Sequence, residues 1–118
     1  MTHTVITDLY DTIVEKYNLN DISTGYGQRY AQGNFKEMKY LGYLVRLEEG
    51  VLKITKDLYR SKDHIFYSGV LVYNVDIHTP EELFAHLDKI IQKEHEELKN
   101  YKLELNQQKL EKIKDDFE

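Results

Sequence analysis

The sequence contains no cysteine among its 118 residues. Without cysteine there is no disulfide framework, no thiol nucleophile and no thiolate metal site. The chain also lacks any run that approaches 18 consecutive apolar residues, and it starts with neither a basic segment nor an apolar stretch of signal-peptide length. These absences predict a soluble cytoplasmic protein with no membrane partner.

The sequence has no internal repeat, low-complexity tract or flexible linker that would divide it. A chain of this length can bury roughly two-thirds of the surface that it exposes when unfolded. We therefore expect one domain over residues 1–118, which needs no metal or disulfide to fold.

Charge is distributed unevenly along the chain. The net charge is −5, with −3 in residues 1–24, +4 in residues 25–62 and −6 in residues 63–118. The basic middle segment favours an anionic ligand or a protein partner. Nucleic acid is less favoured as a partner, because the acidic remainder of the molecule would repel it.

The first third predicts a helix followed by a loop. Apolar residues recur at steps of three and four over residues 6–19, which is typical of an amphipathic helix, with Thr7 or Asp8 placed to cap its start. Residues 18–27 are rich in Asn, Asp, Ser and Gly, so we expect a loop that continues to Gly33.

The middle of the chain predicts strands. Apolar side chains alternate over residues 41–47, and Glu49-Gly50 forms a two-residue turn that pairs Leu47 with Leu52. After a polar turn over residues 61–64, residues 65–77 are apolar on both faces, which favours an interior strand with a bulge at Gly69. This pattern predicts an antiparallel meander of three to four strands.

The last third predicts a long amphipathic helix over residues 79–118. Thr79 is placed as the N-cap, Pro80 as the first helical residue and Glu82 as the capping-box glutamate. The apolar stripe has one acidic interruption and comprises Phe84, Leu87, Ile91, Glu94, Leu98, Tyr101 and Leu105. Beyond Leu105 the spacing slips, which predicts a kink, a break near Asn106 or a stutter. The fold class is α+β.

The length of this helix predicts self-association. A continuous helix would measure about 57 Å, more than the diameter of a domain of this size. Its distal half therefore needs a second chain or must fold back. We expect a homo-oligomer whose contacts come from the apolar stripe and its continuation: Leu87, Ile91, Leu98, Tyr101, Leu105, Leu110, Ile113 and Phe117.

Residues with catalytic or metal-binding chemistry are sparse. No two of the five histidines have the four-residue spacing with which a helix holds a metal ion. No combination of side chains supplies a nucleophile beside a general base. We therefore expect no metal, no cofactor and no enzymatic activity.

Tyrosine and basic residues are interleaved in the middle segment. Six of the ten tyrosines lie between residues 26 and 67, and aromatic rings beside cations can stack bases and neutralise phosphates. Tyrosine also simply fills half-buried strand positions, which is the alternative interpretation. The candidate ligand-binding residues are Gln28, Arg29, Tyr30, Arg46, Lys53, Arg60 and His64.

Three functions fit these patterns. The first is an oligomeric binding protein that acts by occupancy, as an inhibitor, sequestering factor or accessory subunit. The second is a DNA-binding regulator: residues 38–45 and the turn after them loosely resemble a recognition helix entering a wing, which implies helices over residues 7–19 and 34–41 and a wing over residues 43–57. The third is a structural assembly component.

Double-stranded-RNA-binding domains share a similar order of elements. The second helix of those domains starts with lysines that bind phosphates. Here the corresponding helix starts with Pro80, Glu81 and Glu82, which would repel a phosphate.

Overall fold

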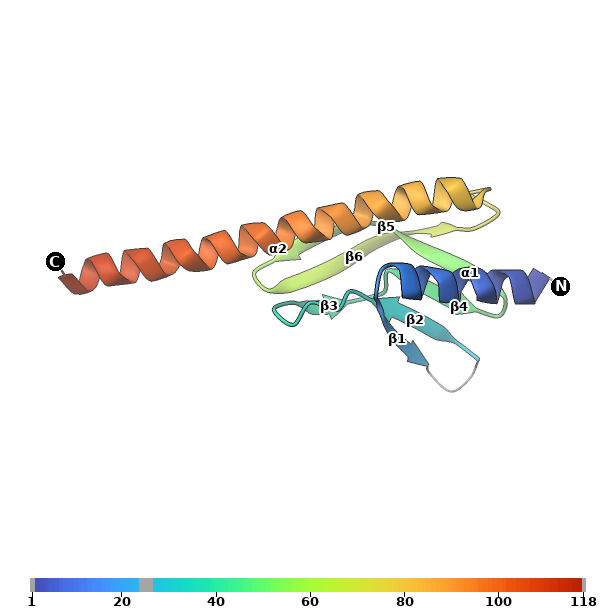
Figure 1. Ribbon diagram of the computed structural model, residues 1–118, viewed down its shortest axis with the longest axis horizontal. Coiled ribbons are helices and arrows are strands. Elements are labelled where there is room, and N and C mark those ends of the chain that lie inside the picture. The colour runs from blue at the N-terminus through green and yellow to red at the C-terminus, as the bar shows by residue number, and fades with distance from the viewer. Residues whose placement is uncertain (1, 24–26, 118) are drawn as a thin grey trace.

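The structure, a computed structural model, describes residues 2–23 and 27–117, with side chains in residues 5–23 and 27–112. It consists of an N-terminal helix, a curled sheet and a long C-terminal helix (Figure 1), which confirms the α+β class. The elements in chain order are α1 (Thr2–Lys16), β1 (Asn20–Ser23), β2 (Arg29–Gln32), β3 (Lys39–Leu41), β4 (Val45–Glu48), β5 (Val51–Ser61), β6 (His64–Val72) and α2 (Pro80–Phe117).

The sheet is mixed and has six strands in the order β1-β2-β4-β5-β6-β3. All neighbours are antiparallel except β3, which pairs parallel to β6. The expected antiparallel meander of three to four strands was therefore wrong in strand number and in the direction of β3. A strand of three residues, such as β3, is too short for an alternating pattern to identify it.

The segment that was expected to be a loop contains the strands β1 and β2. Its first turn-forming residue, Asn18, ends α1 in the left-handed conformation with φ of 50°, and the Leu19 amide donates to the Val14 carbonyl at 3.0 Å. This hydrogen bond and the left-handed residue before it form a Schellman motif, which ends the helix. The following Asn and Asp residues then lie in an exposed edge strand, where their polarity does not disturb a core.

The first helix was predicted correctly, but its start was not. It already runs from Thr2, so neither Thr7 nor Asp8 caps it. Its buried side chains Ile6, Tyr10 and Ile13 follow the predicted spacing and face the sheet.

The hairpin of β4 and β5 confirms the predicted register, with Leu47 opposite Leu52 and Val45 opposite Ile54. Glu49 and Gly50 have φ angles of 51° and 74°. Positive φ at both central residues is the property of a type I′ turn, whose twist matches that of the flanking strands.

The strand β6 lies inside the sheet, as expected, but it ends at Val72 and not at residue 77. The Val72 amide donates to the Asp76 side chain and its carbonyl accepts from the Asp76 amide, both at 2.8 Å, so a turn terminates the strand. Gly69 has φ of 75°, yet the pairing on both sides of it stays one to one, so the predicted bulge is absent at this described position.

The helix α2 begins as predicted and continues without a break to Phe117. The Glu82 amide donates to Thr79 Oγ1 at 3.2 Å, which confirms the N-cap. The phase slip after Leu105 therefore does not mark a kink or a break near Asn106.

Both helices pack on the sheet, α1 over β4 and β5 and α2 over β5. One hydrophobic cluster joins them; its largest fully buried side chains are Tyr10, Ile13, Leu44, Leu52, Ile54, Leu58, Ile65, Leu83 and Leu87. Tyr17 connects the helices by donating to the Asp88 carboxylate at 2.5 Å.

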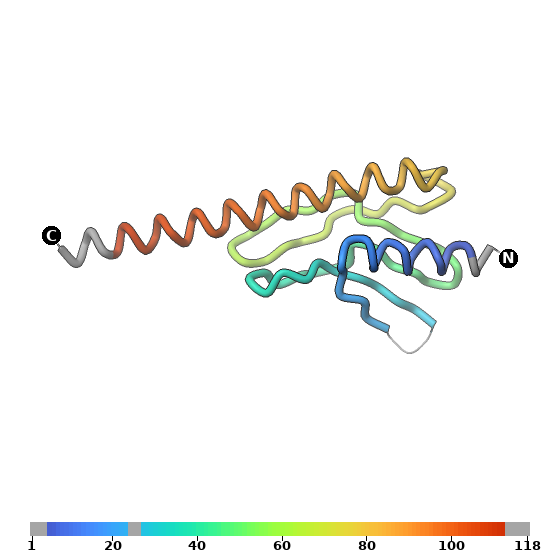
Figure 2. Tube along the Cα trace, in the orientation of Figure 1, coloured from blue at the N-terminus to red at the C-terminus, as the bar shows by residue number. Residues whose placement is uncertain are grey.

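The second half of α2 extends past the sheet (Figure 2). Every residue from Lys102 to Lys112 is exposed. The molecule is 69 Å long and its radius of gyration is 17.4 Å, compared with roughly 13 Å for a compact chain of about 100 residues. In the described part of the chain, neither helix is long and apolar enough to cross a membrane.

The recognition helix of the DNA-binding alternative is missing. Residues 34–41, which were expected to be helical in that alternative, form an irregular turn and the strand β3. The loose resemblance to a winged helix therefore does not extend to the fold.

Candidate functional site

Three of the candidate ligand-binding residues lie in one row across the sheet. Tyr30 of β2 is directly opposite Arg46 of β4, and Arg46 is directly opposite Lys53 of β5. Residues that pair in this way share one face of a sheet. Their neighbours Val45 and Ile54 are fully buried, so the row lies on the face that points away from the helices.

A groove of about 330 Å³ lies beside this row. We call it the outer groove; its lining residues are Tyr30, Gln32, Tyr40, Leu41, Gly42, Tyr43 and Arg46. Gln32 Nε2 donates to the Gly42 carbonyl at 2.7 Å, which connects β2 to the chain after β3. The Arg46 guanidinium lies 5.6 Å from the centre of the Tyr43 ring.

Two cations of the row share one carboxylate. Glu48 Oε2 lies 3.3 Å from Arg46 Nε and 3.6 Å from Lys53 Nζ. Gln28 joins this cluster, since it accepts from Arg46 Nη2 at 2.9 Å and donates to Glu48 at 3.2 Å. The cluster therefore carries more positive than negative charge at the edge of the outer groove.

Arg29 lies apart from this cluster, on the face that holds α1. Its Nη2 is 2.6 Å from Asp21 and 2.8 Å from Asp11, and its guanidinium lies 4.5 Å from the centre of the Tyr10 ring. The Asp21 hydrogen bond raises the pKa of Arg29. Arg29 connects β2 to α1, and its charge is already paired with the carboxylates of Asp11 and Asp21.

Arg60 lies at the other end of β5, against α2. Its side chain is only 9% exposed, and it contacts Glu97 at 2.9 Å and Glu104 at 2.6 Å. It also donates to the Lys62 carbonyl at 2.8 Å. Arg60 is therefore an anchor for α2.

His64 is the first residue of β6, directly after the turn that joins it to β5. Its Nδ1 is 2.8 Å from the Asp63 carboxylate, and its ring stacks on Phe66 with 6.1 Å between the centres. The structure thus brings Gln28, Tyr30, Arg46 and Lys53 together and places Arg29, Arg60 and His64 elsewhere.

The structure also contains a buried acid that sequence reasoning did not assign to a site. Glu94 of α2 is 2% exposed; its Oε1 accepts from the Tyr40 hydroxyl at 2.8 Å, and its Oε2 has no hydrogen-bond partner among the described residues. Burial raises the pKa of Glu94, while the Tyr40 hydrogen bond and His95 oppose this rise. The acidic interruption of the apolar stripe was the signal for this residue.

Two tyrosines and a glycine complete the surroundings of Glu94. The ring of Tyr40 stacks on that of Tyr67 with 6.1 Å between the centres, and the Tyr67 hydroxyl accepts from the Gly33 amide at 2.9 Å. Burial raises the pKa of both tyrosines. A Cβ at Gly33 would overlap Glu94 Oε1 and the Tyr40 ring, so this close packing requires glycine.

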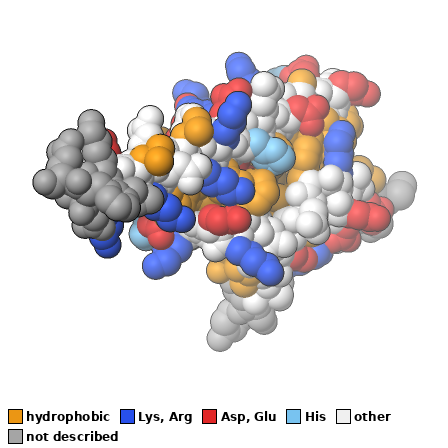
Figure 3. Space-filling model, turned by 60° about the vertical axis from the view of Figure 1, so that its left-hand side comes forward, with side chains coloured by type: hydrophobic (Ala, Val, Ile, Leu, Met, Phe, Trp, Pro, Cys, Tyr) orange, Lys and Arg blue, Asp and Glu red, His pale blue; other side chains and the backbone are white. Residues whose placement is uncertain are grey.

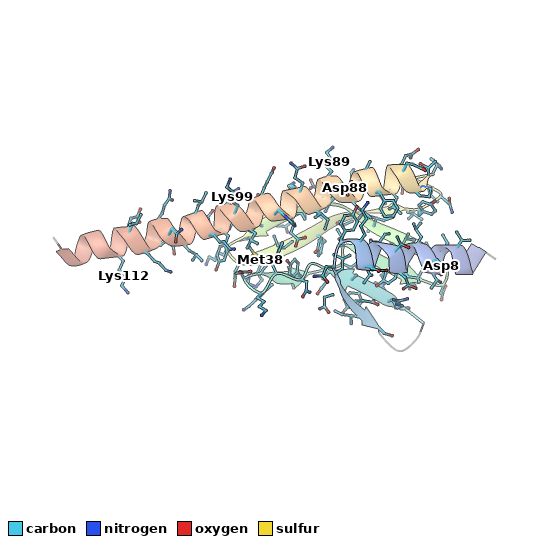
Figure 4. The ribbon with its side chains drawn as sticks, viewed as in Figure 1. Asp8, Met38, Asp88, Lys89, Lys99 and Lys112 are labelled. Carbon is cyan, nitrogen blue, oxygen red and sulfur yellow. The ribbon has the colours of Figure 1, made fainter. Side chains whose placement is uncertain are left out.

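A second polar groove of about 520 Å³ lies between β5 and α2. Its cations include Lys56, Lys89 and Lys93, but Lys93 is 2.8 Å from Asp57. Figure 4 labels Lys89, which points away from the sheet. Since Glu96 and Glu97 also line this groove, it is less suited to an anion than the outer groove.

The proposed contact residues of α2 fall into three groups. Leu87 is fully buried in the core of its own chain, and Ile91, Leu98 and Tyr101 pack partly against that core. Leu105 and Leu110 are 36% and 66% exposed. Ile113 and Phe117 belong to the helix, but their side chains lie outside the described residues.

Comparisons with known proteins add no further assignment. No protein-family model matches the chain, and no curated protein or solved structure was found to match it. Over the described residues, no group of three or more His, Asp or Glu side chains is arranged to hold a metal ion.

Proposed function

We propose that this chain is a small non-enzymatic binding protein that acts by occupancy, as an inhibitor, sequestering factor or accessory subunit, and that it works as an oligomer. Its ligand is an anion with an aromatic ring, such as a nucleotide, held in the outer groove. The observation that supports this most directly is the row of Tyr30, Arg46 and Lys53 across three strands.

The charge of the row suits a phosphate group. Arg46 and Lys53 are about one-third exposed, and their distances of 3.3 and 3.6 Å to Glu48 exceed the roughly 2.7–2.9 Å of a strong charge-assisted hydrogen bond. An anion can therefore compete with Glu48 for these cations. Arg29 and Arg60 are bound to carboxylates more closely and do not offer the same opportunity.

The aromatic side chains suit a planar ring. Tyr30 and Tyr43 both line the outer groove beside Arg46. Stacking of a base on an aromatic side chain contributes roughly 1–3 kcal/mol and tolerates different bases. The groove volume lies at the low end of the roughly 300–1,000 Å³ of small-molecule sites, which favours a mononucleotide over a larger ligand.

Occupancy fits this groove better than catalysis does. Of the described residues that line it, none is a carboxylate or a histidine. General acid–base catalysis usually uses one of these side chains. The ligand would therefore be bound without being transformed.

The ligand proposal is tested by calorimetric titration with the four common nucleoside monophosphates and with the matching nucleosides. Wild type should bind at least one monophosphate, with an affinity that falls as salt concentration rises. The double variant Arg46→Gln/Lys53→Gln should bind at least about tenfold more weakly, which corresponds to about 1.4 kcal/mol.

Lys62→Gln serves as the matched control, because Lys62 is an exposed lysine in the β5–β6 turn. It should bind like wild type. Equal binding by wild type and the double variant would rule out the outer groove as the site. Binding of nucleosides as tight as that of the monophosphates would rule out phosphate recognition.

The alternative of a structural assembly component is favoured by one feature, the exposed half of α2. Native mass spectrometry separates the two proposals, since it reports subunit number and retained ligands together. An oligomer that binds none of the nucleotides would favour the structural component, and a monomer without ligand would contradict both.

A further inference from the structure

The helix α2 carries a second apolar line in addition to the one that faces the sheet. Leu103, Asn106 and Leu110 follow one another at steps of three and four, and the sequence continues this spacing at Ile113 and Phe117. Leu103 and Leu110 are 51% and 66% exposed. We call the line through residues 103, 106 and 110 the α2 seam.

The α2 seam and the core stripe lie on different faces of the helix. At about 100° per residue, the seam is rotated by roughly 150° from the line of Leu87, Glu94 and Tyr101. The sheet of the same chain therefore covers the core stripe and leaves the seam open. Figure 3 shows hydrophobic side chains at the surface beside the grey end of the molecule, with basic side chains around them.

The α2 seam continues onto the folded domain as a groove of about 390 Å³. Phe35, Leu98 and Leu103 give this groove its apolar part, and Lys99 and Lys102 line its side. A partner that follows the seam would thus contact the exposed helix first and the body of the protein afterwards.

We propose that a second copy of this chain covers the α2 seam, with the two α2 helices antiparallel. Heptad spacing of apolar residues is the pattern with which helices pair. An antiparallel overlap centred on residue 108 places Asn106 opposite Leu110 and Leu103 opposite position 113 of the partner copy. This inference rests on the oligomeric part of the proposed function and not on its ligand.

Charge favours a second copy in this direction. Lys102 flanks the seam, whereas the sequence has aspartates at positions 115 and 116. In an antiparallel pair with this register, the flanking positions on one side of the seam pair as 102 with 116 and as 109 with 109. Lys102 therefore faces an acidic position twice, and Lys109 faces its own copy once. A parallel pair would instead place Lys109 opposite a lysine at position 114 twice, and like charges at such flanking positions repel.

The overlap is short, which predicts a reversible dimer. It runs from residue 99 to residue 117, about 28 Å at about 1.5 Å per residue. Such a contact falls near or below the roughly 1,200 Å² at which standard stable interfaces begin. Asn106 faces Leu110 of the partner copy in this register, so its amide lowers stability further. Dissociation on dilution is therefore expected.

Engineered cysteines test the register cleanly because the chain has none of its own. Under mild oxidation, the double variant Leu103→Cys/Ile113→Cys should form disulfide-linked dimers. Leu103→Cys alone should not, because the two copies of residue 103 lie about 15 Å apart along an antiparallel pair. Efficient crosslinking of the single variant would establish a parallel pair and overturn the inference.

Sedimentation velocity over a concentration series tests the surface. Leu110→Asp should shift the protein to monomer, while Gln108→Asp, an exposed position away from the seam, should sediment like wild type. A dimer that survives Leu110→Asp would overturn the α2 seam but leave an oligomeric binding protein intact. A wild type that is monomeric throughout would overturn the inference and the oligomeric part of the proposed function, whereas the nucleotide titration decides the ligand part separately.

Discussion

At the scale of single residues, the basic side chains differ in how closely glutamates of the same chain pair with them. Arg60 is bound to two glutamates and is 9% exposed, while Arg46 and Lys53 share one glutamate at longer distances. The sequence shows where basic residues are concentrated but not which of them meet a carboxylate from a distant element. Arg60 and Glu104 are 44 residues apart in the chain.

Glu94 provides a residue-scale prediction about pH. Because burial raises its pKa in the folded state, its contribution to stability is present below the ordinary carboxyl pKa of about 4.3 and is lost as the pH rises through the raised pKa. Glu94→Gln cannot ionise and keeps an oxygen that can accept from Tyr40. At pH 8 the variant should exceed wild type in unfolding free energy by on the order of 1 kcal/mol.

Urea denaturation between pH 4 and pH 9 measures this difference. Glu96→Gln is the matched control, because Glu96 is exposed on the same helix, and its pH profile should follow that of wild type. If Glu94→Gln lost stability with rising pH as steeply as wild type does, another group would have to be responsible for the dependence.

At the scale of elements, the phase slip in α2 has a structural explanation. The helix stays continuous, and the apolar line moves from the face that packs on the sheet to the α2 seam. A slip in hydrophobic spacing can thus mark a change of apolar face within one continuous helix. The sequence alone does not distinguish this from a break, since both leave the same pattern of residues.

The start of α2 provides an element-scale prediction. Thr79 Oγ1 accepts from the Glu82 amide, so Thr79→Ala leaves that amide without its cap and should cost about 1 kcal/mol of unfolding free energy. Thr12→Ala is a useful contrast: Thr12 donates to the Asp8 carbonyl within a helix, where such a bond adds little. Thermal unfolding of both variants should show a lower midpoint for Thr79→Ala only.

The elements that the sequence predicted correctly are those whose local signals agree with their packing. The β4–β5 hairpin has both an alternating pattern and a two-residue turn, and α2 has both an N-cap and an apolar stripe. The strands β1 and β3 have neither, because they are short and lie at the edges of the sheet. Their pairing depends on contacts with distant strands, which no local pattern records.

The candidate site was predictable to a similar extent. Strand alternation places Arg46 and Lys53 on one face once the hairpin register is known, and the structure adds Tyr30 to the same row. Tyr43, Gly42 and Gln32 could not be added from the sequence. Their position in the outer groove depends on how the chain turns after β3.

At the scale of the whole molecule, the folded body and the exposed half of α2 should be separable. A chain that ends at Leu105 keeps every residue of the hydrophobic cluster and also keeps Glu104, the partner of Arg60. It removes most of the α2 seam. We therefore expect its melting temperature to stay within about 2 °C of wild type at dilute, monomeric concentration, since little buried surface is lost.

Self-association should respond differently to the same truncation. The chain ending at Leu105 should remain monomeric at concentrations where the full chain dimerises, as measured by sedimentation. A second truncation, after Tyr101, also removes Glu104 and should melt several degrees lower, because Arg60 then loses a charged partner. A shortened chain that still dimerises would place the contact on the folded body, and one that fails to fold would show that the distal half of α2 stabilises the domain within a single copy.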